Sequence, residues 1–286
     1  MRGYAKERTF KILFALLSAV TVVFVGIIIV YLLVAGLPAI KQIGLKAFLL
    51  GDRWNPDGET PQFGVLPFIL TSLYGTAGAI ALGVPQGVLC AVFISKLAPG
   101  RLRSVLRTTV ELLAGIPSVV FGLIGMTVLV PFVQRVFDLP SGANLFSTII
   151  ILSVMILPSV INVSENALSA VPREYELGSI ALGADKTETT FRVSLPAAKS
   201  GIVASIVLGV GRSIGETMAV MMVSGNVANM PGLFRSVRFL TTAVSSEMAY
   251  SSGLHRKALF SIALVLFLFL GFVNLCFRLL LRRGNE

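Results

Sequence analysis

Six runs of apolar residues, each long enough to cross a lipid bilayer as a helix, occur in this sequence. They lie at 12–37, 67–95, 110–132, 146–168, 198–224 and 258–281. Inside a bilayer the backbone must satisfy its own hydrogen bonds, and runs of this length do so as helices. We therefore expect an all-α polytopic membrane protein with about six transmembrane helices. No Pro- or Gly-rich linker divides the chain, so residues 1–286 should form a single transmembrane domain.

Composition agrees with a membrane protein. The chain is 55% hydrophobic and only 13% charged, whereas a soluble domain has about 25% charged residues. The net charge of +10 could indicate nucleic-acid binding, but the basic residues form short clusters between apolar runs, which is typical of membrane topology. The first run, 12–37, is longer than the roughly 7–15 apolar residues of a signal peptide, so we expect a retained span.

The loops predict an orientation. On one side, which includes the N-terminus, they carry nearly twice as many Lys and Arg residues as on the other. The positive-inside rule therefore puts both termini in the cytoplasm, the loop at 39–66 outside and the loop at 169–196 inside. In the outer loop we expect Trp54 to be an interfacial anchor, with partner docking as the alternative. His255, the one histidine, is expected to be a loop residue whose side chain is solvated or at headgroup level.

The middle of the fifth run contains two charged residues, Arg212 and Glu216. A charge at bilayer depth costs at least ~2.5–3.5 kcal/mol, so such residues indicate a functional site. A spacing of four would put both on one face of one helix. The Arg fork matches phosphate oxygens, Glu216 could neutralise it in the empty site, and Ser213 and Thr217 could add hydroxyls. We predict that these four residues line an anion translocation path; the alternative is a structural ion pair.

The loop at 169–196 should form two short amphipathic helices at a corner. Pro172 suits the first turn of a helix, and Gly183 suits the left-handed position just past a helix end. Asp185 followed by Glu188 predicts a capping box that opens the second helix. The apolar residues of such a hairpin need a cover, either from the protein's own helix ends or from the groove of a partner.

This loop resembles the EAA loop of ABC-importer permeases, whose pattern is Glu-Ala-Ala, three residues, Gly, nine residues, Ile, one residue, Leu-Pro. The second half matches well, with Val193 in place of Ile. The first half departs, because residues 177–179 are Leu-Gly-Ser and Glu176 comes one place early. The resemblance implies a loop that couples to a partner ATPase. Its residues here are Glu176, Leu177, Gly183, Ala184, Leu195 and Pro196.

Further motifs narrow the resemblance. Residues 111–123 and 211–220 look like the third-span and fifth-span motifs of phosphate-specific permeases. Residues 54–68 and 235–260 are similar to the PstC-type subunit rather than to its PstA partner. The resemblance implies a type I ABC-importer permease in the bacterial inner membrane, with coupling helices between spans four and five. It also implies a PstA-type second permease, an ATPase dimer and an extracytoplasmic phosphate-binding protein.

Other functions remain open at this point. The sequence has no Gly-x-x-x-x-Gly-Lys-Ser/Thr loop, so we expect no cofactor in this chain, with ATP and Mg on the ATPase. Molybdate or sulfate could replace phosphate, since oxyanions share this chemistry. An ion-coupled secondary transporter would want several intramembrane carboxylates or histidines, yet only Glu216 lies near mid-span; Glu111 and Glu165 fall toward span ends. A membrane scaffold would leave Arg212 unexplained. Cys90 and Cys276 show no metal-binding spacing.

Overall fold

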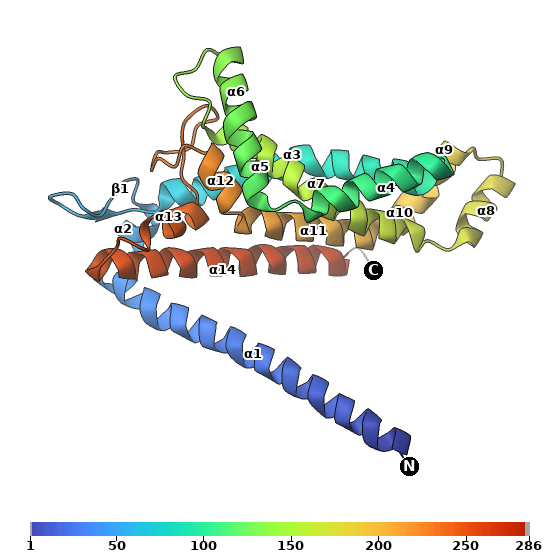
Figure 1. Ribbon diagram of the computed structural model, residues 1–286, viewed down its shortest axis with the longest axis horizontal. Coiled ribbons are helices and arrows are strands. Elements are labelled where there is room, and N and C mark those ends of the chain that lie inside the picture. The colour runs from blue at the N-terminus through green and yellow to red at the C-terminus, as the bar shows by residue number, and fades with distance from the viewer. Residues whose placement is uncertain (1, 284–286) are drawn as a thin grey trace.

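The computed structural model describes residues 2–283, with side chains for residues 10–276 and 279. Figure 1 shows the long helices lying mostly along one axis of the molecule. The helices are α1 Arg2–Ile43, α2 Leu45–Leu50, α3 Leu66–Val92, α4 Gly100–Gly115, α5 Ser118–Ile124, α6 Val130–Val136, α7 Leu145–Ser169, α8 Arg173–Ala181, α9 Lys186–Thr189, α10 Leu195–Ala197, α11 Lys199–Gly215, α12 Met218–Val223, α13 Leu240–Glu247 and α14 Gly253–Arg283. The π-helical turns Phe93–Leu97, Gly125–Leu129 and Thr190–Ser194 continue α3, α5 and α9. Strands β1 Trp54–Asn55 and β2 Gln62–Phe63 pair antiparallel, with Trp54 opposite Phe63.

Several stretches are long and apolar enough to cross a membrane. In the described residues these are Phe10–Ile43, Leu66–Leu97, Ser118–Val136, Leu145–Ser169 and Gly253–Cys276. The run Lys186–Ala197 joins α11 at a bend of 69°, and this bent pair makes a sixth. The expected all-α architecture with about six spans is confirmed.

The helix α7 lies at the centre of the bundle and packs against α3 and α11. Its residues Leu152, Met155 and Ile156 are fully buried. Gly83 of α3 allows this contact, because a Cβ there would lie 2.8 Å from the Ile156 side chain and from the Ser153 carbonyl. Small residues at helix contacts let backbones approach closely, which drives association where lipid gives no hydrophobic advantage.

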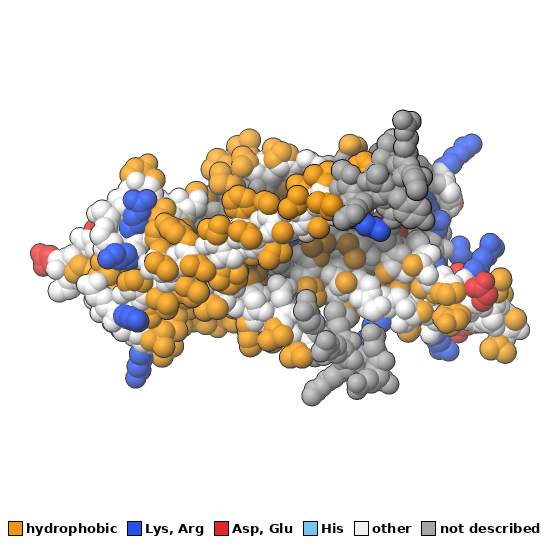
Figure 2. Space-filling model, turned by 90° about the horizontal axis from the view of Figure 1, so that it is seen from below, with side chains coloured by type: hydrophobic (Ala, Val, Ile, Leu, Met, Phe, Trp, Pro, Cys, Tyr) orange, Lys and Arg blue, Asp and Glu red, His pale blue; other side chains and the backbone are white. Residues whose placement is uncertain are grey.

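The exterior has the charge distribution of a membrane protein. Figure 2 shows hydrophobic side chains over the middle of the face that α1 and α14 form, with Lys, Arg, Asp and Glu at both ends. Phe14, Phe24 and Val34 of α1 are more than half exposed, at 64%, 62% and 69%. In Figure 1 α1 diverges from the bundle and meets α14 only near one end. A large apolar surface of this kind is stable only against lipid or another membrane chain.

The expected third span at 110–132 is wrong in its bounds. Helix α4 ends at Gly115, and the apolar helical stretch begins only at Ser118. The break follows from Pro117, since the residue before a proline avoids the helical region, and Ile116 is extended at φ −72°, ψ 126°. Glu111 therefore lies on α4, a separate helix.

The expected fifth span at 198–224 is also interrupted. Helix α11 ends at Gly215, Glu216 is extended at φ −69°, ψ 132°, and α12 begins at Met218. The prediction that Arg212 and Glu216 share one helix face is therefore wrong. The physical reason is that the Glu216 carboxylate accepts a hydrogen bond from the backbone N–H of Ala219, 3.2 Å away, in the first turn of α12. A carboxylate before a helix satisfies N–H groups that have no partner inside the helix.

One end of the molecule, the hairpin end, has its own small core of α2, the β hairpin, α13 and the start of α14. Trp54 is only 8% exposed there and makes edge contacts with Phe63 and Phe68, so the predicted interfacial anchor is wrong. The prediction of a solvated loop for His255 is also wrong, because it lies in α14 with a side chain only 14% exposed. The rings of Trp54 and His255 pack against each other although they lie more than two hundred positions apart in the sequence, and this packing helps to bury both.

Candidate functional site

The break between α11 and α12 places the predicted charges apart. Arg212 is half-buried near the end of α11, and its Nη1 donates a hydrogen bond to the hydroxyl of Ser159 on α7, 3.2 Å away. Among the residues that the structure describes, no ion pair joins Arg212 to Glu216 or to another carboxylate. The guanidinium has five N–H donors in a planar fork. Most of this fork therefore has no fixed anionic partner.

The two broken helices lie next to each other. Helix α12 packs against α5, and both helices begin at a break (Figure 1). Gly122 of α5 permits the contact, because a Cβ there would lie 2.9 Å from the Cα of Ala219. Non-helical backbone at membrane depth is tolerated where it is buried in protein or lines a water-filled cavity. Two adjacent breaks with an arginine nearby are the arrangement expected of a polar path through the bundle.

Contacts from other helices hold the second break in place. The Glu216 carbonyl accepts a hydrogen bond from the Thr241 hydroxyl on α13, 2.9 Å away. The Thr217 hydroxyl donates to the Gly215 carbonyl at 3.3 Å. Ser213 is 2% exposed, and its hydroxyl has no hydrogen-bond partner in the described chain. Of the four predicted path residues, Arg212 and Ser213 thus lie in α11, and Glu216 and Thr217 form the break itself.

The corner between α8 and α9 matches the local predictions. Gly183 has the left-handed φ of 93°, and a Cβ there would meet nothing within 4 Å, so conformation alone demands glycine. The capping box is present in both directions: Glu188 N–H donates to Asp185 at 2.7 Å, and Asp185 N–H donates to Glu188 at 3.3 Å. Pro172 lies one residue before α8 rather than in its first turn.

Glu176 fixes this corner to the rest of the protein. Lys96, at the end of the span that α3 begins, lies 2.5 Å from its carboxylate, and the Ser194 hydroxyl donates to it at 2.8 Å. Burial raises the pKa of Glu176, but hydrogen bonds from Lys96 and Ser194 and the nearby positive charges outweigh it and hold the pKa below its ordinary value. Glu176 therefore holds the loop in place from within the chain.

The corner leaves apolar side chains without a cover. Leu177 and Ile180 are 54% and 51% exposed, and Leu182 is 91% exposed. Ala184 is half-buried beside Gly183. Leu195 and Pro196 form α10, next to the bend into α11. The described chain thus does not cover the apolar side chains of the corner.

Sequence reasoning missed a cluster at the hairpin end. The Glu247 carboxylate accepts a hydrogen bond from Trp54 Nε1 at 3.0 Å, contacts His255 Nε2 at 2.8 Å and pairs with Arg238. Trp54 lies 193 positions from Glu247, so no local pattern connects them. The one signal in the sequence was that tryptophan and histidine each occur only once. Both contact this one carboxylate.

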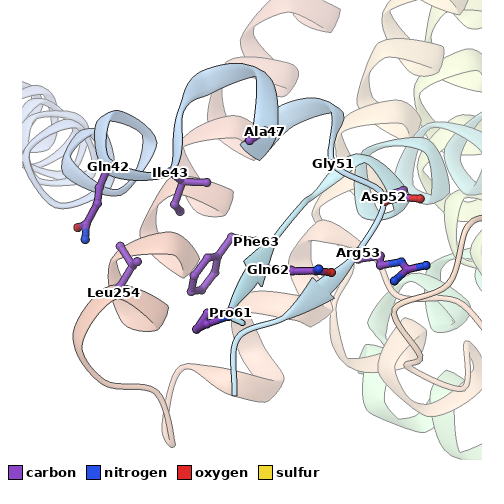
Figure 3. Close-up of a pocket in the computed structure, with 10 residues that line it drawn as sticks. All are labelled: Gln42, Ile43, Ala47, Gly51, Asp52, Arg53, Pro61, Gln62, Phe63 and Leu254. Atoms are coloured by element: carbon purple, nitrogen blue, oxygen red, sulfur yellow. The ribbon is translucent and has the colours of Figure 1, made fainter. Parts of the chain in front are cut away.

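A cavity of about 800 Å³ lies beside the same hairpin. Figure 3 shows Ile43, Phe63 and Leu254 on one side of it and Asp52 and Arg53 farther along the hairpin. None of the residues at the two helix breaks lines it. This cavity is therefore separate from the break.

Comparison with known proteins identifies relatives along most of the chain. Residues 83–284 match the family model described as "Binding-protein-dependent transport system inner membrane component". A probable ABC transporter permease protein, YqgH of Bacillus subtilis, is 38% identical over 84% of this chain and 79% of its own length. The phosphate transport system permease protein PstC of Haemophilus influenzae is 30% identical over 98% and 94%. PstC of Pasteurella multocida is 34% identical over 83% and 80%.

Solved structures show the same fold. A methionine ABC transporter, MetNI, in inward-facing conformations aligns at TM-score 0.62 and 18% identity, covering 78% of this chain and 96% of that one. A bacterial alginate ABC transporter in complex with a periplasmic protein aligns at TM-score 0.63 and 17% identity, covering 96% and 94%. Both are ABC transporters, so the predicted permease fold is confirmed.

Proposed function

This chain belongs to the binding-protein-dependent transport system inner membrane components, and we propose that it is the PstC-type permease subunit of an ATP-driven phosphate importer. Relatives named as phosphate permeases match 98% and 83% of its length. The proposal of anion transport rests on one observation of the structure. Arg212 lies near a helix break and has no carboxylate partner among the described residues. A half-buried cation at membrane depth without an anionic partner is costly and is by default a functional-site hypothesis.

The path would use Arg212 as its anion contact. The planar fork can bind two phosphate oxygens, and Ser159 holds one side of it. A transport site must also release its substrate, which a single arginine permits better than a cluster of them. Ser213 and Thr217 could donate hydroxyls beside it. Glu216, held on α12, repels an anion and so favours its departure.

The partners would follow from the exposed surfaces. The corner at Gly183, with Leu177, Ile180 and Leu182 exposed, would seat in a groove of an ATPase dimer that carries ATP and Mg. A second permease of the PstA type would complete the path. A phosphate-binding protein would deliver the substrate on the other side. This chain itself would be a membrane subunit and not an enzyme.

The proposed orientation has the α8–α9 end in the cytoplasm and the hairpin end outside the bacterial cytoplasmic membrane. Both chain termini would then be cytoplasmic. This orientation is supported by the excess of Lys and Arg in the loops on the side that includes the N-terminus. Impermeant thiol labelling of intact cells tests it, since Asp57→Cys should react and a cysteine at Glu286 should not.

Transport by the reconstituted complex tests the function. The chain, its partner permease and the ATPase are placed in liposomes, with the binding protein supplied on the outer side and ATP on the other. We expect uptake of labelled phosphate, and this uptake should depend on ATP and on the binding protein. An excess of sulfate or molybdate should not inhibit it. Uptake of sulfate or molybdate in place of phosphate would support the alternative oxyanion, and uptake without ATP would support an ion-coupled carrier.

A further inference from the structure

The short helix α13 connects two sites that the sequence does not relate. Near its start, Thr241 donates its hydroxyl to the carbonyl of Glu216 in the break of the fifth span, 2.9 Å away. At its end, Glu247 accepts the hydrogen bond of Trp54 from the β hairpin. Figure 1 shows α13 between the β hairpin and the region where α11 ends. Eight helical residues span about 12 Å at 1.5 Å per residue.

The Glu247 end joins three separate segments. Trp54 comes from β1, His255 from α14, and Arg238 from the loop before α13. Arg238 in turn donates to the carbonyl of Asn226 through Nε at 3.0 Å and Nη2 at 2.8 Å. The side chain of Glu247 is only 20% exposed, and those of Arg238 and His255 are 16% and 14% exposed. Hydrogen bonds to a partly buried carboxylate are among the strong ones in proteins.

The helix between the two ends is held firmly. Leu240, Thr242 and Ala243 are fully buried. The Thr242 hydroxyl accepts the backbone N–H of Phe239 at 3.0 Å, and the Ser72 hydroxyl on α3 accepts that of Leu240 at 3.1 Å. A packed, capped helix moves as a unit, so a displacement at one end is felt at the other.

We propose that Thr241 and Glu247 are positioning residues of the translocation path, which fix the break at Glu216 to the outer hairpin through α13. Engagement of the hairpin end by the binding protein then changes the position of the Glu216 backbone, and with it the path. This inference rests on the proposed function, because it requires an outer binding protein and a transported anion.

The decisive pair of variants is Thr241→Val and Thr241→Ser. Valine keeps the shape of threonine and removes the hydroxyl, whereas serine keeps the hydroxyl. The matched control is Thr148→Val, because Thr148 is also buried but its hydroxyl donates only locally, to the carbonyl of Asn144 at the start of its own helix α7, 2.9 Å away. The readout is the ratio of ATPase activity with the binding protein to that without it, together with phosphate uptake by the intact complex in liposomes.

We expect Thr241→Val to lower both quantities about tenfold, a change within reach of one hydrogen bond. Thr241→Ser and Thr148→Val should stay within about twofold of the wild type. Glu247→Gln should act like Thr241→Val, and the double variant should be no worse than either single one, because a connection cut at one end is not weakened by cutting the other.

Several outcomes overturn the proposal. One is a Thr241→Val complex that transports like the wild type or loses no more than Thr148→Val; another is a double variant with additive losses. If Thr241→Val does not assemble, Glu247→Gln decides alone, and failure of both to assemble assigns the two residues to folding. A wild-type complex that takes up no phosphate contradicts the proposed function instead.

Discussion

The corner at Gly183 and the break at Glu216 are both places where a helix stops, yet different parts of the chain stabilise them. At the corner, the left-handed glycine and the Asp185–Glu188 box satisfy the helix ends within a few residues. At the break, Ser159 and Thr241 bind across 53 and 25 residues. The corner leaves its apolar side chains outside, available to a partner, whereas the break keeps polar groups inside the bundle. In the proposed function, the locally stabilised stop would serve assembly, and the stop held by distant residues would serve the path.

This difference explains what the sequence could predict. The apolar runs predict the bundle because lipid imposes one requirement on every span, and the capping pattern predicts the corner because its bonds are local. The family and the fold are confirmed by the comparisons. The break was missed because Gly215 and Glu216 lie in an apolar run, which was interpreted as one continuous helix. Glu216 does accept the Ala219 N–H locally, but no local pattern predicts the hydrogen bond from Thr241 to the unwound carbonyl. Trp54 was missed for the same reason, since its partner Glu247 is remote in sequence. His255 lies only eight positions from Glu247, but the ring that packs against it, Trp54, is remote.

The largest expected effect tests the break. Arg212→Gln removes the charge and the fork, and we expect phosphate uptake to fall about 100-fold while the complex still assembles. This corresponds to about 3 kcal/mol, the upper range for a charged hydrogen bond. The control is Arg135→Gln, the same change at an exposed arginine of α6, which should leave uptake intact. Uptake that survives Arg212→Gln would show that the break does not serve the anion.

A second variant separates transport from structure at the same break. If Arg212 and Glu216 were a structural pair, Arg212→Gln with Glu216→Gln would recover uptake, because no charge is left without a partner. The absence of an ion pair between them in the described chain favours the other result, assembly without transport. Uptake by the double variant, measured beside assembly on a sizing column, decides between the two.

The corner should respond to conformation alone. Gly183→Ala and Gly178→Ala make the same change at glycines whose added Cβ would meet nothing within 4 Å, but only Gly183 has a positive φ. A left-handed alanine costs about 1–2 kcal/mol, so we expect Gly183→Ala to lower uptake and coupled ATPase activity about tenfold. Gly178→Ala lies inside α8 and should be neutral or slightly stabilising. Equal effects of the two variants would contradict the claim that the positive φ of Gly183 is what the corner requires.

The smallest expected effect concerns the anchoring of that corner by Glu176. Because its folded pKa lies below the ordinary value of 4.5, its contribution is fully present above pH 4.5 and is lost as the pH falls through the folded pKa. The contact is partly exposed, so we expect about 1 kcal/mol at most. Hydrogen exchange of the α8 backbone amides, corrected for intrinsic rates, should show protection that declines below pH 4.5 in the wild type. In Glu176→Gln it should be lower and flat with pH, because the amide neither titrates nor pairs with the Lys96 charge. If both proteins respond alike to pH, Glu176 does not stabilise the corner. The apolar contacts and local helix caps of the corner then hold it in place.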